Sequence, residues 1–323
     1  MPVREGENGV RVAIVLPTYR RVSCLERCLA GIARQRRPAD EVLVVYRPEE
    51  DPETKALVAA MSERAQLPIR GIEVYRPGLV HALEAGAAAA RADVVAATDD
   101  DAVPRPDWLA RLMALYADGV GGVGGRDVIH TPTGTLGGQA NVVGQVAWFG
   151  RVVGNHHVGH GLPRRVQVLK GVNMSFRKEL WKFEYTLAGR GAQVHSELFL
   201  SLRVRRLGWD VLYDPEAMVD HYPAYRPEGD ARGLWQPADV EAASYNATLA
   251  LVAYAPTWQG VVRAGYRVLV GDFGAPGPVR AGLALLQRRP EAIVGMRPAM
   301  RGAIRAIAVR LGQHWPAQGG DDA

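Results

Sequence analysis

Short apolar runs alternate with longer helix-forming segments along the first hundred residues. Four runs rich in β-branched residues predict buried strands, at residues 10–16, 41–46, 71–75 and 93–98. The segments between them predict helices, at residues 24–35, 52–64 and 79–91. This alternation is typical of an α/β protein whose mostly parallel sheet is sandwiched by helices, and ligands of such sheets bind at the carboxyl ends of the strands.

The pattern weakens in the middle of the chain and changes near its last quarter. Residues 131–165 have no strong period, which favours loops or a mobile lid, and residues 171–221 predict short strands and one amphipathic helix. Later segments rich in Ala, Leu, Val and Arg predict helices separated by Pro and Gly. We therefore predict an α/β domain over residues 1–239 and an Arg-rich helical C-terminal extension over residues 240–323, with residues 318–323 disordered.

Composition and charge exclude several classes of protein. The 323 residues are 48% hydrophobic and 23% charged, as in a globular chain. Residues 1–239 carry 30 Lys and Arg against 29 Asp and Glu, so no nucleic-acid-binding role is expected. Residues 260–312 carry nine Arg against two acids. Two interpretations of this segment stay open: helices that contact an anionic membrane surface, or helices that pack on the main domain with a solvated basic face.

Other features fit a reducing compartment. The first ten residues lack the apolar stretch of a secretory signal, and no clean apolar run reaches the roughly 20 residues that a spanning helix needs. Cys24 and Cys28 stand one helical turn apart, which favours core packing over a disulfide or a metal site. We expect a cytoplasmic protein, peripheral on the inner face of the cell membrane if the extension binds lipid.

An acidic triplet, Asp99-Asp100-Asp101, directly follows the fourth predicted strand. Three adjacent carboxylates repel one another, and a hard divalent cation would neutralise them while leaving room for phosphate oxygens. The alternative is a solvated acidic turn before Pro104. The position after a buried strand of an α/β sheet favours a metal–diphosphate site.

These features together resemble the family 2 glycosyltransferases of the GT-A fold, over roughly residues 10–225. The resemblance depends on order and spacing rather than on one motif. Its parts are Pro17-Thr18-Tyr19-Arg20 after the first strand, the triplet followed by Pro104 and Trp108, the GVNMSFR segment at residues 171–177, and Glu197 before Leu202-Arg203…Arg206-Leu207-Gly208.

The resemblance implies a set of roles for these residues. Pro17, Thr18, Tyr19 and Arg20 would line the nucleotide of a nucleotide-sugar donor. Asp99 and Asp101 would form the DxD pair, with Asp99 and Asp100 near the donor and Asp101 on Mn²⁺ or Mg²⁺. Glu197 would be the general base that takes the proton of the acceptor hydroxyl, and His221 would be a third metal ligand.

Two positions depart from the family pattern. Many relatives carry an acid after the second strand, where this chain has Arg47; either Glu49 or Asp51 replaces that acid, or Arg47 meets phosphate. The usual Glu-Asp pair before the late helix is Ser196-Glu197 here. The identity of the nucleotide therefore stays open.

Three further polar residues are candidates for the acceptor side. Asn173 lies in the GVNMSFR segment, and it could equally be structural. His156 and His157 lie in a Gly-rich stretch with His160, which favours an acceptor-side loop over a plain surface loop or a metal cluster. Trp108 and Trp181 are more typical of packing than of sugar platforms.

The sequence thus predicts a metal-dependent, inverting glycosyltransferase. It would move a sugar from a nucleotide-sugar to a hydroxyl of a saccharide or lipid-linked acceptor, in the synthesis of cell-surface polysaccharide or glycolipid. Two alternatives stay open: a non-catalytic nucleotide-sugar-binding protein of the same fold, and a sugar nucleotidyltransferase. The latter usually has a Gly-rich basic loop after the first strand, where this chain has Pro17-Thr18-Tyr19-Arg20-Arg21.

Overall fold

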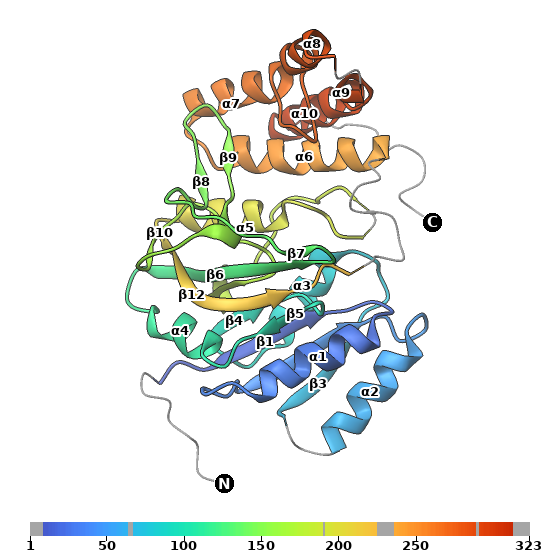
Figure 1. The fold of residues 1–323 in the computed structure, drawn as a ribbon, viewed down its shortest axis with the longest axis vertical. Coiled ribbons are helices and arrows are strands. Elements are labelled where there is room, and N and C mark those ends of the chain that lie inside the picture. Colours follow the sequence, from blue (N-terminus) through green and yellow to red (C-terminus); the bar gives the residue numbers. More distant parts are fainter. Residues whose placement is uncertain (1–8, 64–66, 190, 225–235, 289–290, 313–323) are drawn as a thin grey trace.

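A ten-stranded sheet forms the centre of the protein in the computed structural model (Figure 1). The structure describes residues 9–63, 67–189, 191–224, 236–288 and 291–312, so the predicted disorder at residues 318–323 lies outside it. The main path of the sheet runs β10-β12-β6-β11-β4-β1-β2-β3, with β5 paired to β12 and β7 paired to β6. The strands are β1 (Val12–Pro17), β2 (Glu41–Tyr46), β3 (Ile69–Glu73), β4 (Val94–Ala97), β5 (Ala102–Pro104), β6 (Val120–Thr131), β7 (Gly134–Thr135), β10 (Arg164–Arg165), β11 (Met174–Arg177) and β12 (Asp210–His221).

The first four predicted strands form the parallel part of the sheet. β1 pairs in parallel with β2 and β4, and β2 pairs in parallel with β3. β11 enters antiparallel between β4 and β6, and β6 and β12 run parallel to each other. This mixed sheet with helices on both faces confirms the predicted α/β architecture.

Helices cover both faces of the sheet because successive side chains of a strand point to opposite faces. Along β1, Ile14 and Leu16 face a cluster that includes apolar residues of α1 and α4, whereas Ala13 and Val15 face one that includes residues of α3 and α5. These helices are α1 (Val22–Ala33), α3 (Leu79–Ala89), α4 (Trp108–Ala114) and α5 (Ser196–Arg206), and α2 (Pro52–Glu63) packs beside β3. The absence of polar residues inside β1, β2 and β4 thus reflects burial on both sides.

The aperiodic middle section is built from short pieces. They are the hairpin of β8 (Gln145–Val146) and β9 (Val152–Val153), the 3₁₀ turn η1 (His156–Val158), and β10 at the edge of the sheet. A second 3₁₀ turn, η2 (Lys178–Leu180), follows β11. In Figure 1 the β8–β9 hairpin stands between the sheet and the C-terminal helices.

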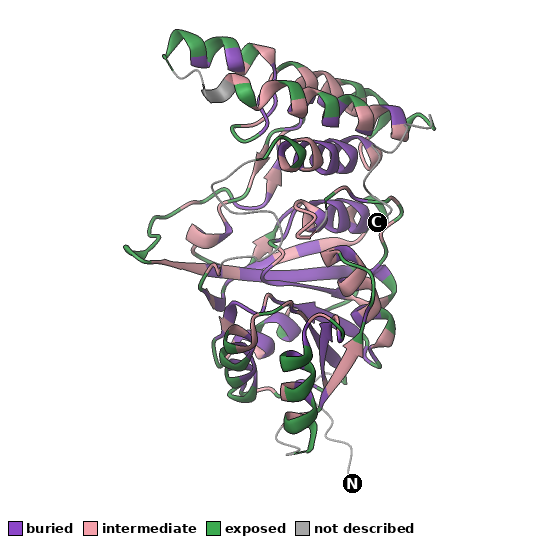
Figure 2. Cartoon of the chain, turned by 90° about the vertical axis from the view of Figure 1, so that its right-hand side faces the viewer, coloured by how far each residue is buried: buried purple, intermediate pink, exposed green. Residues whose placement is uncertain are grey.

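The C-terminal extension is helical, as predicted. It consists of α6 (Pro237–Ala253), α7 (Thr257–Leu269), α8 (Pro278–Leu286), α9 (Glu291–Val294) and α10 (Met296–Arg310). α6 lies between the α/β part and the outer helices, and Figure 2 shows it largely buried. Leu198, Phe199 and Leu202 of α5 share one hydrophobic cluster with Leu249 of α6 and Ala306 of α10. The division at residue 239 stays a prediction, because the core is continuous across it.

The arginines of the extension differ from the expectation. Both sequence interpretations placed them at the surface, but Arg263 and Arg267 on α7 are buried. Arg263 donates to the carbonyls of Leu251 and Trp148, and Arg267 donates to the hydroxyl of Thr248 and the carboxylate of Asp272. Their partners explain the burial, because an arginine inside a protein requires acceptors for its N–H groups.

Two arginines of α10 also have partners within the extension. Arg301 pairs with Glu241 at 3.5 Å, and the guanidinium of Arg305 lies 4.8 Å from the ring centroid of Tyr245. Both partners belong to α6. These two arginines therefore help to fasten α10 to α6.

The β6–β12 pair supplies a test of the fold. β12 carries a register shift between Asp214 and Met218, and a Cβ on Gly125 would lie 1.8 Å from the carbonyl oxygen of Ala217 in that shift. Because backbone cannot yield as a flexible side chain can, we expect Gly125→Ala to destabilise the protein by about 1–3 kcal/mol or more. Thermal unfolding would measure the effect.

Gly282→Ala is the matched control. Gly282 lies in α8, and a Cβ there would meet nothing within 4 Å. This change should leave stability the same or raise it by up to about 1 kcal/mol. A melting temperature of Gly125→Ala equal to that of the wild type would contradict the packing described for β6 and β12.

Candidate active site

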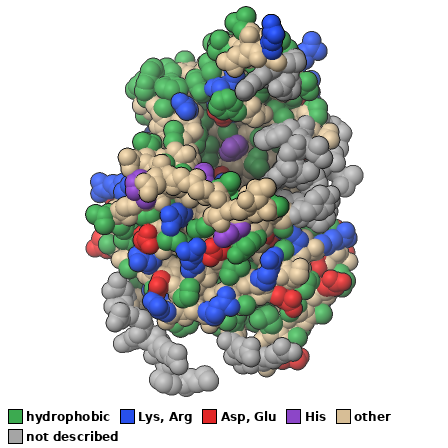
Figure 3. All heavy atoms as spheres, in the orientation of Figure 1, with side chains coloured by type: hydrophobic (Ala, Val, Ile, Leu, Met, Phe, Trp, Pro, Cys, Tyr) green, Lys and Arg blue, Asp and Glu red, His purple; other side chains and the backbone are tan. Residues whose placement is uncertain are grey.

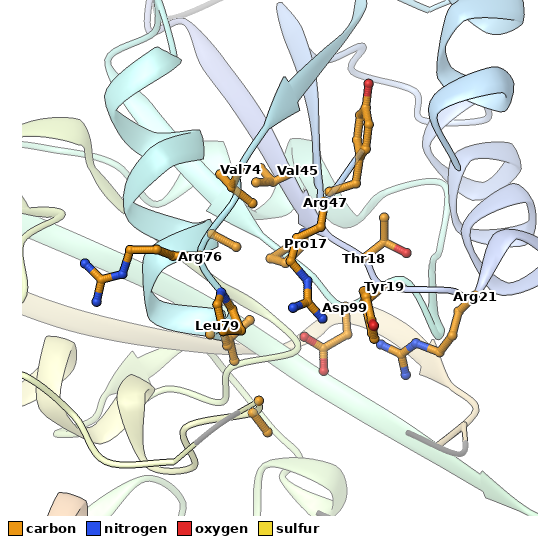
Figure 4. A pocket seen from close by; sticks show the side chains of 16 residues that line it. Pro17, Thr18, Tyr19, Arg21, Val45, Arg47, Val74, Arg76, Leu79 and Asp99 are labelled. Atoms are coloured by element: carbon orange, nitrogen blue, oxygen red, sulfur yellow. The ribbon is translucent and has the colours of Figure 1, made fainter. Parts of the chain in front are cut away.

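The carboxyl ends of β1, β2 and β4 meet at one edge of the sheet and form a pocket. Its lining comes from segments that lie far apart in the sequence: Pro17, Thr18, Tyr19 and Arg21; Val45, Tyr46 and Arg47; Val74, Arg76, Pro77, Gly78, Leu79 and Ala82; Asp99; and Gly191 and Ala192. About 820 Å³ of space, part of it open to solvent, lies between these residues. In Figure 4, Arg47, Tyr19, Arg21 and Asp99 lie together on one side of the pocket, and Arg76 points away from Asp99.

The acidic triplet is largely buried, which brings strong electrostatic constraints. Asp100 is fully buried, accepts a hydrogen bond of 2.6 Å from the Thr18 hydroxyl and pairs with Arg21 at 2.5 Å. Burial raises the pKa of Asp100 to about 7, although Arg21 and Thr18 oppose that rise. Arg21 also reaches Asp101 at 3.4 Å. Asp100 therefore binds the loop after β1 through Thr18 and Arg21, and it is not among the residues that line the pocket.

Asp101 and Asp99 meet His221, which ends β12. One ligand atom from each of these three residues lies within 4.8 Å of the others. His221 Nε2 is 3.5 Å from Asp101 Oδ1, which is too long for a hydrogen bond but close enough for an ion pair. Burial would raise the pKa of Asp101, but His221, the backbone N–H of Ala224 and Arg21 outweigh it and lower that pKa. The sequence prediction that joined Asp99, Asp101 and His221 is thus consistent with their positions.

This donor set fits a divalent cation. Two carboxylates and one imidazole are ligands that Mn²⁺ accepts, and Mg²⁺ takes the carboxylates. Among the residues that the structure describes, Asp101 Oδ1 and both ring nitrogens of His221 are buried without a hydrogen-bond partner. Buried polar atoms normally have partners, so these atoms mark a place where a ligand belongs.

Asp127 faces the ring nitrogen of His221 that is turned away from Asp101. This residue was not identified from the sequence. It lies on β6, in register beside β12, and its carboxylate oxygen is 3.8 Å from His221 Nδ1. Within the described part of the chain neither of its buried oxygens has a hydrogen-bond partner. Burial alone would lower the pKa of His221, but Asp101 and Asp127 outweigh it and raise the pKa to about 9. A Gly-Gly-Arg-Asp sequence in a strand carries no signal that its Asp faces a histidine 94 residues later.

In the loop after β2, the buried Asp51 accepts hydrogen bonds that stabilise the local structure. Asp51 is buried, accepts from the side-chain and backbone groups of Thr54 at the start of α2, and accepts a hydrogen bond of 2.6 Å from the backbone N–H of Arg20. Asp51 is therefore engaged by Thr54 and Arg20, and it is not among the residues that line the pocket. Arg20 itself is exposed, outside the pocket lining, and donates to the Glu50 carbonyl.

Tyr19 and Arg47 form a paired surface inside the pocket. The guanidinium of Arg47 lies 4.0 Å from the ring centroid of Tyr19, and both side chains bind Glu50, Arg47 at 2.9 Å and the Tyr19 hydroxyl at 2.9 Å. A guanidinium held close to an aromatic ring is a preorganised contact for an anionic group. Arg47 thus lines the pocket at the position after β2 where the family resemblance leads us to expect an acid.

Glu197 lies in the first turn of α5, at the same edge of the sheet. Its carboxylate oxygen is 3.8 Å from the Cβ position of Gly171, and the adjacent Val172 carbonyl accepts a hydrogen bond from Thr98, the residue before the triplet. The backbone before it is strained, because Gln193 and His195 adopt positive φ angles of 42° and 71°. Burial lowers the pKa of both His156 and His195, and Glu197 opposes that shift in each.

The acceptor-side predictions need correction. Asn173 is 0% exposed; it accepts from the Trp108 indole at 2.8 Å and donates to the carbonyls of Arg126 and Ala217, so it cannot touch an acceptor. His156 is buried as well, with Nε2 2.9 Å from the Val168 carbonyl oxygen. His157, half-buried in η1, stays a prediction. Trp108 and Trp181 pack in the core, as expected.

With the geometry established, comparison with known proteins identifies the class. The model of the "glycosyltransferase like family 2" matches residues 10–232, which is more than half of the chain. The chain therefore belongs to this family and is a glycosyltransferase with a GT-A fold. A comparison with curated proteins gives no match.

Solved structures share the fold at low sequence identity. A mannosyltransferase, PcManGT, from Pyrobaculum calidifontis in complex with GDP-Man and Mn²⁺ is 19% identical, with a TM-score of 0.50 over 95% of this chain and 76% of that chain. TarS 1–349 from S. aureus in complex with UDP-GlcNAc is 13% identical, with a TM-score of 0.55 over 95% and 93%. GalNAc-T7 with UDP, GalNAc and Mn²⁺ is 16% identical, with a TM-score of 0.59 over 96% of this chain and 59% of that chain.

We expect Asp127→Asn to weaken metal binding by about 10–100-fold, because a carboxylate behind a ligating histidine fixes the ring and its tautomer. Mn²⁺ titrations of the purified protein, followed by electron paramagnetic resonance, would measure the affinity without any turnover. Asp107→Asn removes an exposed carboxylate that pairs only with Arg36 in the described structure, and it should leave the affinity unchanged. Equal Mn²⁺ affinity in the Asp127 variant and the wild type would rule out this role.

Metal affinity should also rise with pH. His221 must be neutral to ligate, and its pKa of about 9 means that it carries a proton at pH 7. Each cation bound below pH 9 then displaces that proton, so the association constant should rise about tenfold per pH unit between pH 7 and 9 and level off above. The same titration at several pH values would measure the slope, and His221→Ala should abolish it. A flat profile in the wild type would contradict ligation by His221.

Proposed function

We propose that the protein transfers a sugar, with inversion and with the help of Mn²⁺ or Mg²⁺, from a nucleotide-sugar to a hydroxyl group of a saccharide or lipid-linked acceptor. The observation that carries the proposal is the meeting of Asp99, Asp101 and His221 beside the pocket at the strand ends. Ligands of open α/β sheets bind at this edge. Two of the three solved structures described above are Mn²⁺ complexes, one with GDP-Man and the other with UDP and GalNAc, which fits a nucleotide-sugar donor.

The donor would lie between the loop after β1 and the loop after β2. Tyr19 and Arg47 offer an aromatic ring beside a guanidinium, Val45 and Val74 offer apolar side chains, and Asp99 offers a carboxylate. Asp99, Asp101 and His221 would hold the metal, which when bound neutralises the diphosphate and stabilises it as a leaving group. Arg47 would contact a phosphate or the base, as its place in the pocket allows.

Glu197 would act as the general base. Its carboxylate takes the proton of the acceptor hydroxyl, the hydroxyl oxygen forms a bond to the anomeric carbon, and the bond from that carbon to the diphosphate oxygen breaks. One displacement inverts the anomeric centre, and the proton ends on Glu197. Glu197 lies against Gly171, at the edge of the sheet that carries the triplet, and the strained residues before it fix the start of α5.

The acceptor belongs to cell-surface polysaccharide or glycolipid synthesis in this proposal, and the protein works at the inner face of the cell membrane. None of the helices in the described ranges is both long and apolar enough to cross a bilayer. A lipid-linked acceptor would then be reached from the membrane surface, where basic side chains of the C-terminal helices meet anionic lipid.

We expect Glu197→Gln to abolish transfer while donor binding is kept, since the amide cannot accept the proton but preserves the shape. Thermal unfolding with UDP, GDP, dTDP or CDP, each with and without Mn²⁺, would measure donor binding. A nucleotide at a hundred times its Kd should stabilise by about 2.7 kcal/mol in both proteins. Radiolabelled sugar transfer from the nucleotide-sugar so identified would measure activity.

The matched control is Glu179→Gln, an exposed acid in η2, which should lose neither property. Full transfer activity of the Glu197 variant would remove Glu197 as the base. No stabilisation by any nucleotide, with or without Mn²⁺, would count against the whole proposal and favour a protein that has the fold without the donor site.

A further inference from the structure

Helix α7 buries polar side chains and exposes apolar ones, the reverse of an ordinary surface helix. Arg263 and Arg267, its two arginines, face the protein interior and are buried there, whereas Trp258, Val261 and Leu269 face outward. Trp258 is 60% exposed although it is the largest side chain of the helix. A helix on a globular protein normally places its apolar stripe toward the core. Here the described chain leaves that stripe uncovered.

Helix α8 and the loop before it continue the same surface. α8 buries the small residues Ala281 and Ala284, and it exposes the large residues Leu283 and Leu286, the latter 83% exposed. Phe273, in the loop between α7 and α8, is 88% exposed. We call the outward side chains of Trp258, Val261, Leu269, Phe273, Val279, Leu283 and Leu286 the apolar face.

The β8–β9 hairpin supports α7 from the inward side of that helix. Trp148, in the turn of the β8–β9 hairpin, is exposed, and its carbonyl accepts a hydrogen bond from Arg263 of α7. The neighbouring Phe149 ring packs on Tyr266 of α7 with centroids 5.0 Å apart. Figure 3 shows hydrophobic side chains gathered over the C-terminal helices, with Lys and Arg side chains beside them.

The charge around the apolar face is positive. Residues 254–288 contain one acid, Asp272, and it pairs with the buried Arg267. Arg280 lies on α8 with its guanidinium 4.6 Å from the Phe273 ring centroid, and Arg288 is exposed just beyond the helix. Large apolar side chains that include a tryptophan, with arginines beside them, are the composition of an interfacial membrane-binding segment.

We propose that the apolar face inserts into the interfacial layer of an anionic lipid bilayer and holds the enzyme there as a peripheral protein. A second copy of the chain is a poorer occupant, because a two-fold contact joins the same positively charged surface of both copies and offers Arg280 and Arg288 no anionic layer. A bilayer with anionic headgroups offers both the apolar layer and the opposite charge. This inference deepens the membrane location in the proposed function and does not depend on the donor chemistry.

Vesicle binding by the full chain tests the inference. We expect the protein to co-sediment with vesicles of phosphatidylcholine and phosphatidylglycerol, at least tenfold more tightly than with phosphatidylcholine alone, and to do so without any nucleotide. The combined change Trp258→Gln, Phe273→Ser and Leu286→Gln should weaken binding at least tenfold. Leu162→Gln is the matched control, because Leu162 is 83% exposed but lies on the catalytic side, before β10.

The metal-dependent stabilisation by nucleotide shows that each variant is folded and separates this test from the test of the donor site. Intact nucleotide binding with no binding to the anionic vesicles would overturn the inference while leaving the proposed chemistry in place. A concentration-dependent dimer in sedimentation velocity that the triple variant abolishes would also overturn it, since a second copy would then cover the apolar face. Equal vesicle binding by the triple variant and the wild type would mean that another surface binds lipid.

Discussion

The packing of negative charge at the end of β4 is the constraint around which the rest of the site is arranged. Asp100 and Asp101 are buried where the solvent cannot screen them, and burying a charge without compensation is costly. Thr18 and Arg21 from the loop after β1 compensate Asp100, and His221 from β12 compensates Asp101. The triplet thereby fixes three segments that the sequence keeps far apart.

The negative charge of the carboxylates around His221 is only partly compensated, and this is where the proposed metal site lies. The His221 ring lies between Asp101 and Asp127, at 3.5 Å and 3.8 Å, so it takes part in two long ion pairs, and its nitrogens make no hydrogen bond in the described structure. A proton on His221 balances the two carboxylates when no cation is present. In the proposed function a divalent cation would balance the same two carboxylates with more charge, and the proton on His221 would then have to leave.

The strand ends could be predicted from the sequence because the local pattern determines them. Runs such as residues 10–16 and 93–98 read as buried parallel strands, and residues that follow such strands share one edge of the sheet. The pairing of β6 with β12 could not be predicted in this way, because it depends on tertiary contacts across about 90 residues. Asp127 was missed and Asn173 was misassigned for that reason. The buried arginines of α7 were missed because their acceptors, Thr248 and the Leu251 carbonyl, belong to a different helix.

Helix α6 links the C-terminal extension to the loop that precedes Glu197. Asn246 of α6 accepts a hydrogen bond from the backbone N–H of Ala188 and donates to the carbonyls of Ala188 and Val194, so it holds the loop that precedes Glu197. The same loop supplies Gly191 and Ala192 to the donor pocket. On its other side α6 carries α7 through Thr248, whose hydroxyl accepts from Arg267. Because Arg267 occupies the inward side of α7, the apolar side of that helix has to face outward. The hydrogen bond from Arg267 to Thr248 therefore attaches α7 to α6 and also turns the apolar side of α7 outward.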